Sequence, residues 1–134
     1  MQTIYKGDFC EYTFQQENDL LVGRWFNTDY MTQDVFKEEL LRGELFAIEQ
    51  CKPSAYLVDT SNFELPITPE TQKWMAEHLT VSYVQNGVKK VAFLRSHTFV
   101  AQLSIQQSNN ETANREVEKQ HFSNEKEALT WLKS

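Results

Sequence analysis

The stretch Ala55–Trp74 reads AYLVDTSNFELPITPETQKW and decides the fold. Its first five residues form a nearly continuous apolar run, which is typical of a short strand buried on both faces of a sheet. Thr68, Pro69 and Glu70 then predict a helix start, because they offer a hydroxyl cap, a proline for the first helical position and an acid for the first turn.

A helix is also predicted before this strand, from the Thr32 cap to the stop at Lys52-Pro53. Apolar residues recur along it at helical spacing. A buried strand between two helices implies a β–α–β crossover and therefore parallel pairing with an earlier strand.

Three segments at the start of the chain alternate polar and apolar side chains, the pattern of half-buried strands. They are Thr3–Gly7, Phe9–Gln15 and Leu20–Phe26. Asn18-Asp19 is a turn signal between the second and the third, so we expect the sheet to begin with antiparallel strands.

Five further segments are predicted after Ala55–Trp74, whose closing helix ends at Asn86-Gly87. They are a strand over Val88–Leu94, a helix over Thr98–Gln107, an exposed loop over Ser108–Arg115, an edge strand over Glu116–Phe122 and a helix capped by Ser123. Residues 1–134 are thus expected to form a single α/β domain, with a mixed central β-sheet, an N-terminal antiparallel portion and flanking helices.

Composition excludes some classes of function. The net charge of −6 disfavours nucleic-acid binding, because a phosphate backbone needs a basic surface. The chain lacks an apolar run long enough to span a membrane, and its N-terminus lacks the pattern of a secretory signal. Without a signal, Cys10 and Cys51 are expected to be reduced thiols, and the expected location is the cytoplasm.

Polar residues cluster where the buried strand ends. Asp59, Thr60, Ser61 and Asn62 follow one another, and Thr68 begins the next helix. In open α/β sheets ligands often bind at the carboxyl ends of strands, so this cluster is a candidate binding site for an anion, a phosphate or a partner. The alternative is structural, since Asp and Asn side chains also form local turn bonds of this kind.

Arg95, Ser96 and His97 follow the next strand, and parallel pairing would bring them near Asp59. Asp59, His97 and a serine are the ingredients of a nucleophilic triad. However, the chain has no G-x-S-x-G elbow and no glycine-rich oxyanion loop, so a hydrolase is the least favoured interpretation. A structural ion pair between Arg95 and Asp59 explains the same residues.

No metal or cofactor site is predicted. The cysteines and the histidines His78, His97 and His121 have no ligand-like spacing. The four glycines do not form a phosphate-binding loop. Trp25, Trp74 and Trp131 are expected to pack in the core or at its rim. Alternatively, Trp25, Trp74 and Phe99 line an apolar pocket between the sheet and its helices.

Three segments in this order resemble the SpoIIAA-like, STAS-related domains, including bacterial STAS/SEC14-like proteins of unknown function. They are VDTSNF followed by PITPETQKW, then GVKKVAF, and finally HFSNEKEALTWL. The resemblance covers Leu20–Lys133 and implies a compact α/β domain. Well-known relatives are regulators that bind a kinase partner and are switched by phosphorylation of a serine in an Asp-Ser-Ser-Gly-like motif. This chain has Asp59-Thr60-Ser61-Asn62 instead, so the phosphorylation switch does not transfer.

The resemblance therefore favours a non-enzymatic module that acts by binding an unknown protein partner, with the Asp59–Thr68 loop and Arg95–His97 as its surface. The alternative is a domain that binds a small apolar ligand or a lipid, as the SEC14-like label implies. The aromatic content of so small a chain also suggests a homodimer.

Overall fold

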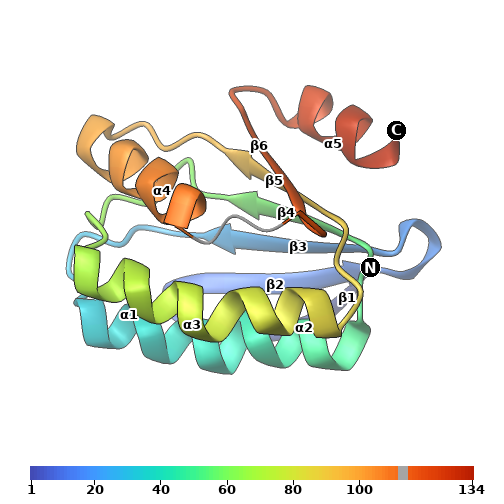
Figure 1. Cartoon of the computed structure of the whole chain (residues 1–134), viewed down its shortest axis with the longest axis horizontal. Helices are drawn as coiled ribbons and strands as arrows, with labels where there is room; N and C mark the ends of the chain where they lie inside the picture. The colour runs from blue at the N-terminus through green and yellow to red at the C-terminus, as the bar shows by residue number, and fades with distance from the viewer. Residues whose placement is uncertain (112–114) are drawn as a thin grey trace.

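The computed structural model of the chain describes residues 1–111 and 115–134. Within them, a six-stranded sheet lies between α5 on one side and the other helices on the opposite side (Figure 1). In chain order the elements are β1 (Gln2–Lys6), β2 (Cys10–Gln15), the 3-10 turn η1 (Gln16–Asn18), β3 (Leu20–Trp25), α1 (Gln33–Glu39), the π-helical segment η2 (Leu40–Leu45), α2 (Phe46–Cys51), β4 (Ala55–Asp59), α3 (Pro69–Gln85), β5 (Lys90–Leu94), α4 (Phe99–Glu111), β6 (Glu118–Phe122) and α5 (Glu125–Lys133). The predicted α/β fold with a mixed sheet is confirmed.

The strands lie in the sheet in the same order as in the chain. β1, β2 and β3 are antiparallel, whereas β3, β4, β5 and β6 run parallel. β3 therefore joins the two halves of the sheet. The parallel register places Arg24, Asp59 and Leu94 side by side at the carboxyl ends of their strands.

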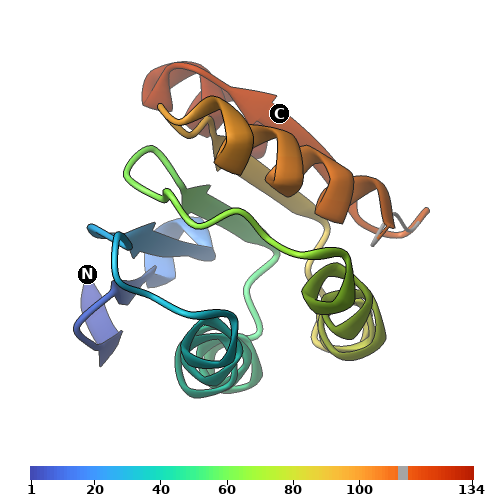
Figure 2. The same cartoon turned by 90° about the vertical axis from the view of Figure 1, so that its left-hand side faces the viewer.

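The parallel strands are added in one direction, from β3 to β6, without a reversal. Successive right-handed crossovers in one direction place their helices on the same face of a sheet. Accordingly, the helices between β3 and β6 cover one face, which we call the crossover face, and α1–α2 and α3 lie there side by side (Figure 2). α5 covers the other face, the α5 face. Among the described strands no reversal creates the crevice that holds ligands in doubly wound sheets.

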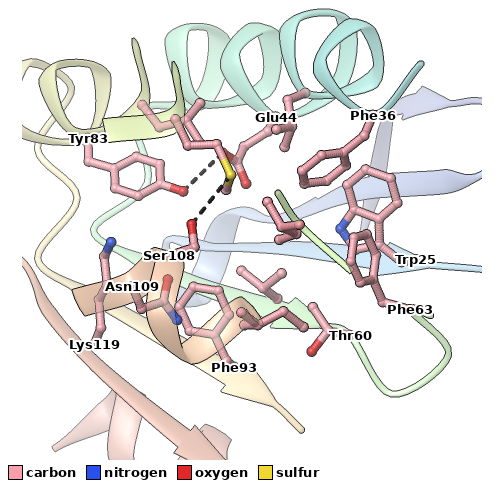
Figure 3. A pocket seen from close by; sticks show the side chains of 16 residues that line it. Trp25, Phe36, Glu44, Thr60, Phe63, Tyr83, Phe93, Ser108, Asn109 and Lys119 are labelled. Carbon is pink, nitrogen blue, oxygen red and sulfur yellow. Dashed lines mark hydrogen bonds between the residues drawn. The ribbon is translucent and has the colours of Figure 1, made fainter. Parts of the chain in front are cut away.

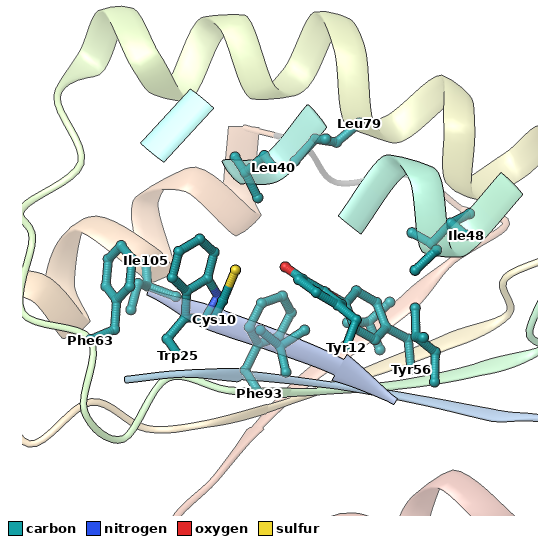
Figure 4. Close-up of a cluster of buried hydrophobic side chains, with 14 of the residues drawn as sticks. Cys10, Tyr12, Trp25, Leu40, Ile48, Tyr56, Phe63, Leu79, Phe93 and Ile105 are labelled. Carbon is teal, nitrogen blue, oxygen red and sulfur yellow. The ribbon is translucent and has the colours of Figure 1, made fainter. Parts of the chain in front are cut away.

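Residues of each central strand alternate between two separate cores. In β4, Tyr56 and Val58 belong to the core of the crossover face, while Leu57 belongs to the core of the α5 face. The core of the crossover face holds large aromatic side chains from several strands, among them Tyr12 and Phe93, beneath helical leucines (Figure 4). The core of the α5 face is smaller and its fully buried members are aliphatic.

α1, η2 and α2 form one uninterrupted helical segment over residues 33–51. The predicted cap is confirmed, because Thr32 Oγ1 accepts a hydrogen bond of 3.2 Å from the backbone N–H of Val35. Lys52 ends the helix in the left-handed conformation, with φ of 46°, and Pro53 follows. The six π-helical residues in the middle are not predicted from the sequence.

Two local predictions are wrong. The predicted loop over Ser108–Arg115 is helical up to Glu111, because Ser108 continues the buried stripe of α4 below Ile105 and is 1% exposed. The rest of that predicted loop includes residues 112–114, which lie outside the described residues. The final helix is capped by Asn124 and not by Ser123, since the Asn124 side chain accepts a bond of 3.1 Å from the N–H of Glu127.

Both cysteines are free thiols, and Cys10 is completely buried. None of the helices in the described part of the chain combines the length and the apolarity that crossing a bilayer requires.

Candidate functional site

A cavity of about 50 Å³ lies between the crossover face and the helices α1, α3 and α4 (Figure 3). A buried water needs about 10–15 Å³ of such space, so the cavity has room for roughly four water-sized groups. Most of the lining is apolar. Its polar groups other than Thr60, which lies near Phe63, are found toward one end (Figure 3). The cavity is therefore suited to a small molecule with an apolar body and a polar head.

The apolar end is formed by three aromatic side chains in mutual contact. Trp25, Phe36 and Phe63 have ring centroids 5.3 Å apart in each pair, and their planes are tilted or perpendicular. These side chains come from β3, α1 and the loop after β4, so distant parts of the chain fix this wall. Such tilted packing is the preferred geometry for aromatic pairs and gives a rigid wall.

The polar end is organised around Glu44, whose side chain is almost completely buried, at 4% exposure. Its carboxylate accepts hydrogen bonds from the hydroxyls of Tyr56, at 2.5 Å, and of Tyr83, at 2.9 Å. Burial raises the pKa of Glu44, and the two tyrosine hydrogen bonds partly oppose this rise. The cavity thus contains a carboxyl group held in a fixed orientation.

Lys119 lies at the same end, on the strand β6. Its Nζ is 5.6 Å from the centre of the Tyr83 ring. Burial lowers the pKa of Lys119 to about 8, although attraction to Glu44 acts in the opposite direction. Ser108 and Asn109 of α4 complete this end of the cavity (Figure 3).

The π-helical segment explains how Glu39 and Glu44 can both be buried on one side of the helix. Glu39 and Glu44 are five residues apart and both are buried. In a regular α-helix this separation turns two side chains about 140° away from each other. A π-helix, with its i to i+5 hydrogen bonds, brings positions five apart closer to the same face. Gly43 permits the close approach, since a Cβ there would lie 2.6 Å from the Tyr12 ring.

Glu39 forms a second buried polar cluster beside the cavity. Its carboxylate accepts a hydrogen bond of 3.0 Å from the Tyr5 hydroxyl and one of 3.3 Å from the Cys10 thiol. Burial, followed by the hydrogen bond to Glu39, raises the pKa of Cys10, so this thiol is not a reactive thiolate. This cluster is structural, whereas the Glu44 cluster faces the cavity.

The predicted site residue Asp59 lies on the α5 face and takes part in an ion-pair network. Arg24 Nη1 is 2.8 Å from Asp59 Oδ2 and 2.9 Å from Glu125 Oε1 of α5. Burial disfavours the ionised form of Asp59, but hydrogen bonds from Ser61 and Arg24 outweigh it and lower the pKa of Asp59. The predicted pair with Arg95 is therefore wrong, because the strand register places Arg24 directly opposite Asp59.

The two predicted loops do meet, since the backbone N–H of His97 donates to the carbonyl of Ser61 at 3.2 Å. The serine side chains of these loops form hydrogen bonds that stabilise the loops. The Ser61 hydroxyl donates to Asp59 at 2.6 Å, and the Ser96 hydroxyl donates to the carbonyl of Phe63 at 2.6 Å. These bonds hold the loops together but do not form the relay of a nucleophilic triad.

Of the other predicted polar residues, Thr60 lines the cavity and Thr68 has a structural role. Thr60 is buried, donates to the carbonyl of Leu94 and lines the cavity, whereas its neighbour Asn62 is exposed. Thr68 caps α3 as predicted, accepting a bond of 3.3 Å from the N–H of Thr71. Thr60 is thus the member of the predicted cluster that reaches the cavity.

Of the predicted pocket residues, Trp25 lines the cavity and the other two do not. Trp74 stacks on the ring of His78 at 4.7 Å and is only half-buried. Phe99 is 79% exposed, because it begins α4 on the side opposite the buried residues Ala101 and Ile105. An apolar pocket exists, but most of its wall differs from the predicted one.

Sequence reasoning missed the residues of the polar end. Lys119 could have been found, because alternation along β6 places it on the same face as His121. Glu44 could also have been found, since it lies four residues after Leu40 and four before Ile48, both on the buried stripe of the helix. Among the described residues, no group of His, Cys, Asp and Glu side chains is arranged to hold a metal ion. A comparison of the chain with protein-family models, with curated proteins and with solved structures finds no match in any of the three.

Proposed function

We propose that this protein binds a small, mainly apolar molecule in the cavity beneath the crossover helices. The observation that carries the proposal is the division of the cavity into an aromatic end, formed around Trp25, and a polar end, formed around Glu44 and Lys119. Buried polar groups destabilise a core unless they are paired, so natural cores rarely keep them without a use.

The charges in the cavity indicate a ligand without net charge. Glu44 and Lys119 attract each other and carry opposite charges when both are ionised. An additional buried charge would have no partner and would be expensive to desolvate. A neutral hydroxyl or carbonyl group, attached to a short branched chain, matches both ends of the cavity.

Isobutanol is a suitable probe, and its binding can be followed by the NMR signals of side chains that line the cavity. We expect saturable shifts in the wild type. Val58→Ile adds one methylene group on the cavity side of β4 and should weaken binding by about tenfold or more, because it fills much of the space.

Val22→Ile is the matched control, since Val22 is a buried valine on the α5 face. It should leave isobutanol binding unchanged. The proposal fails if isobutanol causes no saturable shifts, or if Val58→Ile and Val22→Ile bind it equally well.

Protein binding, which the STAS resemblance implies, is the second candidate function. It is favoured by the exposed apolar side chains Phe99, Val100 and Leu103, which follow the predicted Arg95–His97 surface. The predicted homodimer gives a direct test. Light scattering should detect a dimer that Phe99→Ser dissociates, and a monomer at high concentration would exclude this form of the proposal.

A further inference from the structure

Lys119 lines the cavity, and burial lowers the pKa of its amine. At neutral pH roughly one amine in ten is unprotonated for a lysine with a pKa of about 8, against roughly one in a few thousand for an ordinary lysine. An unprotonated amine is a nucleophile, and desolvated lysines of this kind form imines with carbonyl compounds. The exposed Lys89 of the same chain provides an internal reference.

The surroundings of Lys119 suit the capture of a carbonyl compound. Its amine lies beside the Tyr83 ring, at the polar end of a cavity whose remaining wall is mostly apolar. Glu44, on η2, is attracted to it and is oriented by two tyrosine hydroxyls. On its own strand, His121 is the titratable group that shares its face, and the pKa of His121 is lowered by burial and then by Arg95 and Lys119.

We propose that Lys119 captures a small apolar aldehyde as a reversible imine inside the cavity. This inference rests on the proposed binding function and specifies the chemical class of the ligand. The apolar chain of the aldehyde would occupy the aromatic end, and its carbonyl carbon would lie beside the Lys119 nitrogen.

The chemistry needs no oxidant or reductant. The Lys119 nitrogen adds to the carbonyl carbon, a carbon–nitrogen bond forms, and the carbonyl oxygen takes a proton to give a carbinolamine. The hydroxyl group takes a second proton and leaves as water, so the aldehyde and a lysine ammonium together yield a protonated imine and one water. Glu44 serves as the proton carrier between nitrogen and oxygen, and its carboxylate balances the charge of the protonated imine.

Isobutyraldehyde followed by borohydride tests the proposal, because borohydride converts the imine into a stable isobutyl-lysine. Peptide mapping after brief treatment at neutral pH should show Lys119 labelled about tenfold faster than Lys89, or more. Lys119→Arg should remove this rapid labelling, whereas Lys89→Arg should retain it.

The pH dependence separates this role from mere accessibility. The labelling rate of Lys119 should be half-maximal near pH 8, and Glu44→Gln should move this midpoint to lower pH, because the attraction that raises the pKa of Lys119 is lost. Labelling of Lys119 at the rate of Lys89, or an unchanged midpoint in Glu44→Gln, would overturn the inference.

Isobutanol binding, measured on the same samples, distinguishes the two proposals. If isobutanol binds but Lys119 is not labelled preferentially, the imine is wrong and the binding function stands. If isobutanol does not bind either, both are wrong. Circular dichroism of each variant ensures that the comparison is made between folded proteins.

Discussion

The two faces of the sheet are formed by alternate residues of the same strands, yet the side chains that they bury differ in polarity. The α5 face holds side chains such as Leu20, Val22 and Leu57, and its core is free of buried ionisable groups among the described residues. The crossover face buries Glu39 and Glu44 together with several tyrosines and contains the cavity. A purely apolar core would have been sufficient for folding, so the crossover face is the place to expect function.

Removing the Glu44 carboxylate should have the largest effect on the free energy of unfolding. Glu44→Ala leaves the buried hydroxyls of Tyr56 and Tyr83 without their acceptor and should reduce the free energy of unfolding by about 3–5 kcal/mol. Glu125→Ala removes an exposed carboxylate from the α5 face and should cost less than about 1 kcal/mol. Urea unfolding measures both, and similar losses would show that the two faces do not differ in this way.

Truncating one leucine on each face tests whether only one face binds ligand. Leu79→Ala and Leu132→Ala should each lower the free energy of unfolding by about 2–4 kcal/mol, because both side chains are buried. Only Leu79 lines the cavity, so only Leu79→Ala should admit a larger alcohol such as cyclohexanol. An NMR titration decides the point. Cyclohexanol binding to Leu132→Ala, or to neither variant, would contradict it.

The pH dependence of stability should reveal the buried lysine. The pKa of Lys119 is about 8 in the folded protein and 10.5 for an ordinary lysine, so above pH 8 the unfolded chain holds a proton that the folded protein has released. Stability therefore rises with pH in this window. Relative to Lys119→Met, the wild type should gain about 1.5 kcal/mol between about pH 8 and about pH 9.5.

The comparison with Lys119→Met cancels the titration of cysteines and tyrosines, which both proteins share. Urea unfolding at several pH values gives the difference. A difference between the two proteins that stays constant across this window would mean that Lys119 titrates as an exposed lysine.

Removing a helix cap should lower the free energy of unfolding by a small amount, and by the same amount on both faces. Thr68 caps α3 and Asn124 caps α5, each through a side-chain oxygen that accepts a backbone N–H. Replacing either by alanine should cost about 1 kcal/mol. Thermal unfolding of both variants would show whether local helix signals act independently of the core beneath them.

The elements were predictable because their signals are local. Thr32 and Thr68 cap helices as the sequence indicates, and Ala55–Asp59 forms the predicted buried strand. The end of α4 was not predicted, because Ser108 and the amides after it favour a loop by composition. Tertiary packing against Met75 overrides that preference, with the Ser108 hydroxyl 3.4 Å from the Met75 sulfur.

The site was harder to predict because it depends on register and on helix geometry. The partner of Asp59 follows from the pairing of β3 with β4, which a single sequence does not specify. The burial of Glu39 on the same side as Glu44 follows from the π-helical segment, for which Gly43 is a weak signal. The sequence also favoured a site at the carboxyl ends of the strands, where doubly wound sheets bind ligands. This sheet is wound in one direction, so that rule does not apply to it.

The order of the strands also determines how the protein can assemble during synthesis. Each strand pairs with the strand that precedes it in the chain, so β1 to β5 can join the sheet as they leave the ribosome, without waiting for a later segment. β6, which carries Lys119, is made after the other strands of the described sheet. The polar end of the cavity is therefore completed only after β6 has been made, and until then Glu44 lacks the cation that attracts it.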